Sequence, residues 1–185
     1  MEIPKGVTTI GSGSFAGCTG LTGITIPDSV TSIEDSAFAL CTGLTEIGFP
    51  DSVTSIGQYA FSCCSGLVKV SFGKGIETVR RFAFEECSNL SGVFITDIVA
   101  WCKVDFIGGS TPLYYAKNLY LNGNKVTDLV IPDCVTDIGW GVFRNCESLT
   151  SVKIPDSVKN IKSGTEVFDD ANADTHCSPR AHRQD

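Results

Sequence analysis

The sequence predicts a β-rich solenoid, a right-handed coil of repeats about 23 residues long, with parallel strands and short helical or 3-10 turns. Three residue columns recur at this period, and the register returns after residue 125 with Phe143 and Cys146. The columns are Phe15, Phe38, Phe61 and Phe84; Cys18, Cys41, Cys64 and Cys87; and Leu21, Leu44, Leu67 and Leu90. We therefore expect about seven repeats in a single solenoid domain over residues 1–168.

Each repeat begins with an expected strand, as in "LTEIGFP" at residues 44–50. Ile47 and Phe49 are two residues apart, which is the period of a strand with one face inward. Pro50 lacks an N–H group, so it should end the strand.

A second short extended segment and a helical turn should complete the repeat. After the "PDS" turn, Val53 and Ile56 are placed to point inward. Apolar residues over 60–67 then follow steps of three and four, which predicts a helical or 3-10 turn. Gly66 and its column partners Gly20 and Gly43 should close this turn in a left-handed conformation.

The five cysteines of the repeat column are expected to be free, buried thiols. Stacked rungs have parallel Cβ vectors, whereas a disulfide needs a dihedral angle near 90°. These residues are Cys18, Cys41, Cys64, Cys87 and Cys146. The other four, Cys63, Cys102, Cys134 and Cys177, have no C-x-x-C spacing, so neither a zinc site nor a redox site is expected.

The period is interrupted in the second half of the chain. Leu90 and Val126 are 36 residues apart, 13 more than one repeat, which places an insertion within residues 96–125. Asn122-Gly123 within "LYLNGNKVTDLVI" predicts a hairpin over residues 119–131. The insertion is rich in aromatic residues, namely Trp101, Phe106, Tyr114 and Tyr115. They either form a binding face or pack the insertion onto the stack, and we prefer the second interpretation.

The ends of the solenoid are expected to be uncapped. The last repeat loses its pattern after Ile161, and residues 169–185 should form a polar, disordered tail. Uncapped ends expose strand edges, so we expect either a segment of a longer protein or end-to-end self-association. The N-terminus shows no signal peptide pattern and no anchor is seen.

Composition and motifs argue against several function classes. A net charge of −7 disfavours nucleic acid binding, and no apolar run is long enough for membrane insertion. The only histidines, His176 and His182, lie in the expected tail, so no catalytic residue and no enzymatic activity are expected. No glycine-rich nucleotide-binding motif is present, and no cofactor is expected.

A column of aspartates follows the strand prolines. It comprises Asp28, Asp51, Asp133 and Asp156. Calcium could relieve repulsion between these carboxylates, but aspartate also favours turns because it bonds its own backbone, and water screens exposed charge. We prefer the turn role and expect no metal site.

One repeat template is specific enough to suggest a family. The pattern I-P-D-S-V-T-S-I-x-x-x-A-F-x-x-C stands at residues 26–41 and recurs at 49–64 and 131–146. It resembles the BspA-like leucine-rich repeats of bacterial and protist surface proteins. The resemblance implies a curved solenoid used in adhesion and protein binding, at the cell surface or secreted, but it names no ligand.

The candidate partner-binding surface combines outward strand positions with the aromatic insertion. Its residues are Thr25, Gly48, Ser71, Phe94, Val130, Lys153, Trp101, Tyr114 and Tyr115. A shallow face rich in small and hydroxyl side chains suits a protein or glycan partner. The sequence thus favours a non-enzymatic interaction or adhesion module of a cell-surface leucine-rich-repeat protein. A spacer with no ligand of its own is the alternative, and an enzyme fragment is the least favoured.

Overall fold

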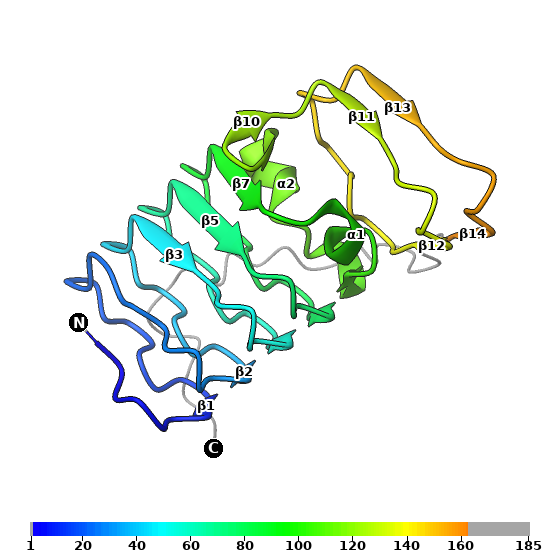
Figure 1. The fold of residues 1–185 in the computed structure, drawn as a ribbon. Helices are drawn as coiled ribbons and strands as arrows, with labels where there is room; N and C mark the ends of the chain where they lie inside the picture. The colour runs from blue at the N-terminus through cyan, green and yellow to red at the C-terminus, as the bar shows by residue number, and fades with distance from the viewer. Residues whose placement is uncertain (1, 163–185) are drawn as a thin grey trace.

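A computed structural model describes residues 2–162 and shows a solenoid of parallel strands (Figure 1). The expected tail at 169–185 and residues 163–168 lie outside this part of the chain. One sheet, which we call the strand sheet, has the order β10-β9-β7-β5-β3. Its strands are β3 (Glu46–Gly48), β5 (Lys69–Phe72), β7 (Gly92–Ile95), β9 (Leu119–Leu121) and β10 (Asn124–Lys125).

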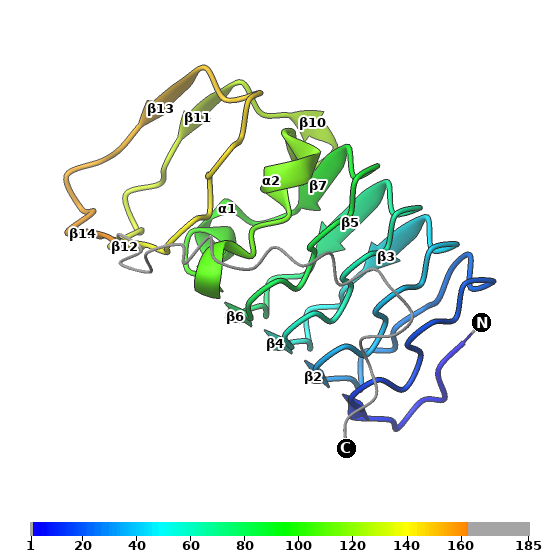
Figure 2. The ribbon, with the colours of Figure 1, turned by 180° about the vertical axis from the view of Figure 1, so that it is seen from behind.

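A second sheet, the return sheet, follows the opposite side of the coil (Figure 2). It contains β1 (Thr9–Ile10), β2 (Ser32–Ile33), β4 (Ser55–Ile56), β6 (Thr78–Val79) and β8 (Asp105–Phe106). Two further pairs continue the coil: β11 (Asp128–Val130) with β13 (Ser151–Lys153), and β12 (Asp137–Ile138) with β14 (Asn160–Ile161). The predicted solenoid of 23-residue parallel turns is confirmed.

The register places equivalent side chains on top of one another. Ile47 pairs with Val70, and Val70 pairs with Val93, so the inward residues of successive strands form a continuous buried row. The phenylalanine column is stacked in the same way. Ring centroids are 5.1 Å apart for Phe15 and Phe38, 5.1 Å for Phe38 and Phe61, and 5.4 Å for Phe61 and Phe84.

The column cysteines are free thiols, and four of them are buried: Cys41, Cys64, Cys87 and Cys146. Cys18 is exposed rather than buried. It lies in the first turn of the solenoid, and no described turn packs against the N-terminal side of that turn. Cys63, the neighbour of Cys64, is not a free thiol because it is disulfide-bonded.

The segment expected to be helical in each regular repeat is instead a chain of hydrogen-bonded turns. Alternate N–H groups point to the next coil: those of Tyr59, Phe61 and Cys63 donate to backbone carbonyls 22 residues later in the sequence. This alternation is incompatible with a continuous i to i−4 pattern. It also sets a left-handed φ at Tyr59 and Cys63, 56° and 57°, and at the equivalent positions of neighbouring turns.

The glycines expected to be left-handed have no positive φ. Gly43 and Gly66 are required for a different reason, close approach to the preceding turn. A Cβ atom would lie 2.3 Å from the Thr19 carbonyl oxygen at Gly43 and 2.2 Å from that of Thr42 at Gly66.

The interruption contains a complete, lengthened solenoid turn rather than a simple insertion. Residues 96–118 include α1 (Ile98–Trp101), the return strand β8, a 3-10 segment η1 (Ile107–Gly109) and α2 (Leu113–Ala116). Strand β8 pairs with β6, so the return sheet runs through this turn.

The hairpin about Asn122-Gly123 is shorter than the predicted 119–131. Strand β9 pairs with β10 in antiparallel fashion, and β10, the second strand of the hairpin, ends at Lys125. Residues 128–130 instead form β11, which pairs in parallel with β13, because Leu129 resumes the buried strand position of the repeat.

Candidate partner-binding surface on the strand sheet

Four of the strand residues predicted to face outward follow one another in one row on the outer face of the coil. Gly48 pairs with Ser71, and Ser71 pairs with Phe94. Thr25 continues the row toward the N-terminus, where it forms a parallel bridge with Glu2. Thr25 and Gly48 are exposed, whereas Ser71 and Phe94 are half-buried.

Val130 and Lys153 belong to the same row but to a separate pair of strands. They are register partners in β11 and β13, and both are exposed, Val130 by 65%. The hairpin strand β10 ends the strand sheet before this pair. The predicted surface is therefore divided into two parts along the coil.

Tyr120 is a member of the row that sequence analysis missed. It pairs with Phe94 in the parallel register of β7 and β9. The two rings are stacked, with centroids 4.5 Å apart and an interplanar angle of 8°. The offset from Phe94 is 26 residues because the turn is lengthened, so a search at 23 residues does not find it.

The aromatic pair is held by its neighbours on the outer face of the sheet. The Lys69 ammonium lies 4.8 Å from the centroid of the Phe94 ring. Gly92 leaves room for both rings, since a Cβ atom there would lie 2.8 Å from Phe94 Cε2 and 3.1 Å from Tyr120 Cε2. A glycine in the strand thus permits the stacked pair to lie close over the backbone.

A shallow groove of about 460 Å³ lies on the N-terminal side of this pair, across the outer face of β3 and β5, and Lys69 and Ser71 line it. Its floor contains small residues, among them Gly23, Thr25 and Gly48. Glu46 and Lys69, register partners on β3 and β5, also line the groove. These strands lie side by side on one face of the coil (Figure 1).

The aromatic residues of the interrupted turn lie elsewhere. Trp101 is only 2% exposed, and its Nε1 donates to the Val142 carbonyl across 2.9 Å, so it packs the turn against the next coil. This position corrects its assignment to a partner-binding surface, because a buried indole has no face to offer.

Tyr114 and Tyr115 lie on α2 and not in the strand sheet. The Tyr115 hydroxyl accepts a hydrogen bond from the Glu86 N–H across 2.9 Å, and burial raises the pKa of this phenol. Tyr114 is 49% exposed, with its ring centroid 5.0 Å from that of Tyr115. The structure therefore does not bring these residues together with the strand row.

A known protein-family model matches nearly the whole chain. A model of the BspA type leucine rich repeat region matches six copies over residues 1–108 and 115–175. The chain belongs to the BspA-type leucine-rich-repeat family. No curated protein sequence matches it significantly.

Several solved structures are similar to this BspA-type chain. A leucine-rich repeat protein from Eubacterium ventriosum is 26% identical, covers 88% of this chain and 41% of that one, and has a TM-score of 0.53. A leucine-rich repeat protein from Bacteroides ovatus is 27% identical, with 86% and 55% covered and a TM-score of 0.47. A leucine rich cell surface protein from Faecalibacterium prausnitzii is 20% identical, with 89% and 60% covered and a TM-score of 0.39. This chain thus spans 41% to 60% of the length of these three proteins.

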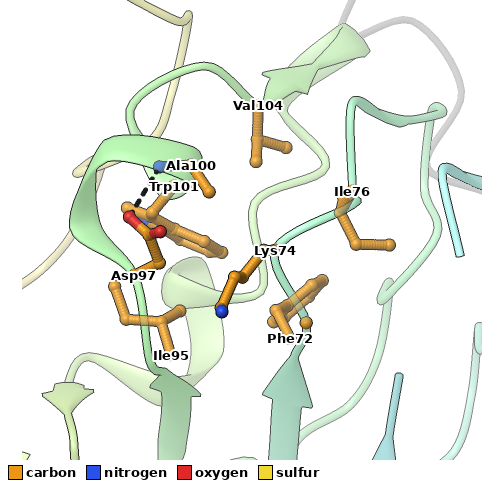
Figure 3. A pocket seen from close by; sticks show the side chains of 9 residues that line it. Phe72, Lys74, Ile76, Ile95, Asp97, Ala100, Trp101 and Val104 are labelled. Atoms are coloured by element: carbon orange, nitrogen blue, oxygen red, sulfur yellow. Dashed lines mark hydrogen bonds between the residues drawn. The ribbon is translucent and has the colours of Figure 1, made fainter. Parts of the chain in front are cut away.

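A small cavity at the turn between the strand sheet and α1 is too small to be a ligand site in this BspA-type chain. Phe72, Lys74 and Trp101 are among its lining residues (Figure 3). Its volume of about 10 Å³ is no more than one water molecule needs. The Asp97 carboxylate beside it accepts from the N–H groups of Val99 and Ala100, at 2.8 and 3.1 Å, and so caps α1.

One aspartate of the column, Asp51, serves the contact between turns of the BspA-type repeat. Asp51 Oδ1 accepts from the backbone N–H of Lys74 across 2.8 Å, and the Lys74 ammonium lies 3.9 Å from Asp51 Oδ2. Asp51 therefore bonds to the following turn rather than to its own backbone. Within residues 2–162, no three His, Cys, Asp or Glu side chains lie in a group that could hold a metal ion.

Every helix in this part of the BspA-type chain is too short or too polar to cross a bilayer.

Proposed function

We propose that this chain is a non-enzymatic protein-interaction and adhesion module, and that a partner binds on the outer face of its strand sheet. The observation that carries the proposal is the stacked pair of Phe94 and Tyr120, which lies half-buried on that face beside the groove. Aromatic residues supply a large contact area and are enriched at protein interfaces. Membership of the BspA-type family supports a cell-surface or secreted location.

A protein partner fits this face better than a glycan. Sugar rings stack on the open faces of aromatic rings, but Tyr120 covers one face of the Phe94 ring and Lys69 lies over the ring as well. With its faces engaged in this way, we expect Phe94 to present mainly its ring edges to a partner, and these suit side chains that pack into a groove. The spacer alternative predicts no partner on this face.

The test is a binding array of extracellular-matrix proteins and glycans, probed with the purified chain and with the double variant F94S/Y120S. We expect binding to at least one protein and loss of that binding in the variant. Tyr114→Ser is the matched control, because it removes an exposed tyrosine outside the strand sheet. Equal binding by both variants would contradict the strand sheet as the site, and no binding at all would favour a spacer.

We also propose end-to-end self-association as a second property of the solenoid. Val152, Ile154 and Ile161 in the last described turn are 40%, 45% and 59% exposed. Strands β13 and β14 of this turn each pair with one described strand only. Sedimentation velocity should show a larger species at higher concentration, reduced by Ile161→Lys, whereas a strict monomer over the whole range would contradict this proposal.

A further inference from the structure

We propose that the middle of the strand sheet binds an acidic, extended segment of the partner protein, whose apolar side chain packs on Phe94 and Tyr120 and whose carboxylates pair with Lys69 and Lys125. This inference rests on the proposed function and names the chemistry of its ligand.

Two lysines stand on either side of the aromatic pair on the same face of the sheet. Lys125 of β10 is the direct antiparallel partner of Tyr120 in β9, and directly opposed residues project to the same face. Lys69 lies two residues before Ser71 on β5, so it shares the outward face of the row, and its ammonium lies 4.8 Å from the Phe94 ring centroid. Both lysines are exposed.

The aromatic rings add to the preference for negative charge. An aromatic ring is negative on its face and positive at its edge. Stacking with Tyr120 occupies one face of Phe94, and the Lys69 ammonium is attracted to the ring's negative π density. The ring edges left to a partner are the electropositive part, so a carboxylate meets favourable charge from the ring edges as well as from the lysines.

On the C-terminal side of this site, the carboxylate of Asp128, three residues after Lys125, is already engaged within the protein. Asp128 Oδ1 accepts from Ser151 Oγ across 2.5 Å, and its Oδ2 accepts from Thr127 Oγ1 across 3.0 Å. These hydrogen bonds lower the pKa of Asp128, so it remains ionised but bonded to its neighbours. Lys153 lies beyond the hairpin in the separate strand pair of β11 and β13, where it is also exposed.

The N-terminal side of the face carries carboxylates, one of them directly opposite Lys69 in the sheet, and this sets a direction for the segment. Glu2 and Glu46 line the groove toward the N-terminus. The protein as a whole carries a net charge of −7, so the lysines at the aromatic pair form a local positive region on an acidic molecule. A segment with carboxylates at one end should therefore place that end toward Lys125, on the side of the aromatic pair that lies away from Glu2 and Glu46.

The experiment is a selection of random twelve-residue peptides on the immobilised wild-type chain, followed by affinity measurements of the selected peptides on variants. We expect selected peptides to carry Asp or Glu beside an aromatic or large aliphatic residue. The double variant K69S/K125S should weaken the binding of these peptides about three- to tenfold, because two exposed ion pairs usually contribute about that much to affinity. F94S/Y120S should abolish it, and raising the salt concentration should weaken it in the wild type.

The control K103S/K159S removes two exposed lysines outside the strand sheet and should leave affinity unchanged. Thermal unfolding of every variant shows whether it folds. Peptides that lose binding in F94S/Y120S but are basic or uncharged would overturn this inference and leave the proposed function standing. Failure to select any peptide that depends on the strand sheet would count against both.

Discussion

The Cys64 thiol donates a hydrogen bond to the backbone carbonyl of Phe38 in the preceding turn, with Sγ and O separated by 3.2 Å. The same bond joins Cys41 to Phe15 at 3.1 Å and Cys87 to Phe61 at 3.2 Å. The cysteine column is therefore more than a row of small apolar residues, because each thiol also supplies a donor to the neighbouring turn.

Alkaline pH should destabilise the fold through these thiols. Burial raises the pKa of Cys41 to about 11 and that of Cys87 to about 12, from the ordinary value of 9.0, and raises that of Cys64 as well. Above pH 9 the unfolded chain loses thiol protons that the folded chain keeps, so the free energy of unfolding should fall as pH rises through this range. Below pH 9 the thiols should contribute no pH dependence.

Urea titrations between pH 7 and pH 11 would measure this effect. The triple variant C41S/C64S/C87S keeps three hydroxyl donors that do not ionise in this range, so its loss of stability above pH 9 should be clearly smaller. An identical alkaline loss in the variant and the wild type would show that other groups are responsible.

Phe61→Ala should lower the free energy of unfolding by about 3 to 5 kcal/mol through the cavity that it leaves. The Phe61 ring is fully buried and stacks on both Phe38 and Phe84. Chemical denaturation measures the difference, with Glu77→Ala as a control at an exposed position in a neighbouring turn. A loss below about 1 kcal/mol would contradict the stacked column as a main element of the core.

The repeat period predicted which side chains are buried because every regular turn places equivalent residues on the same row. It could not predict Tyr120 as the partner of Phe94, since the lengthened turn changes the offset to 26 residues. A weaker signal was present: Leu119 and Leu121 alternate as Val93 and Ile95 do, and the structure pairs them. Matching alternation instead of fixed spacing would have placed Tyr120 in the outward row.

The repeat period also could not predict the hydrogen bonds between turns. A column at a fixed spacing shows that residues are equivalent, but not which backbone groups point to the next coil. Alternate N–H groups from Tyr59 to Cys63 do so, and this produces left-handed residues where the sequence has no glycine.

Ser36→Gly should stabilise the protein by about 0.5 to 1 kcal/mol, because Ser36 has a φ of 55° that glycine adopts without steric cost. Ser32→Gly is the matched control, since Ser32 lies in β2 and glycine weakens a strand. Thermal unfolding should show a higher midpoint for the first variant and a lower one for the second. A lower midpoint for both would show that strain at residue 36 is not significant.

Gly43→Ala should destabilise the protein by about 1 to 3 kcal/mol, whereas Gly20→Ala in the same repeat column should have little effect. At Gly43 a Cβ atom would lie 2.3 Å from the Thr19 carbonyl oxygen, while at Gly20 no atom lies within 4 Å. Neither residue has a positive φ, so a conformational requirement would not distinguish them. Urea denaturation of the two variants tests the explanation directly: equal losses would mean that backbone conformation, and not contact between turns, selects glycine in this column.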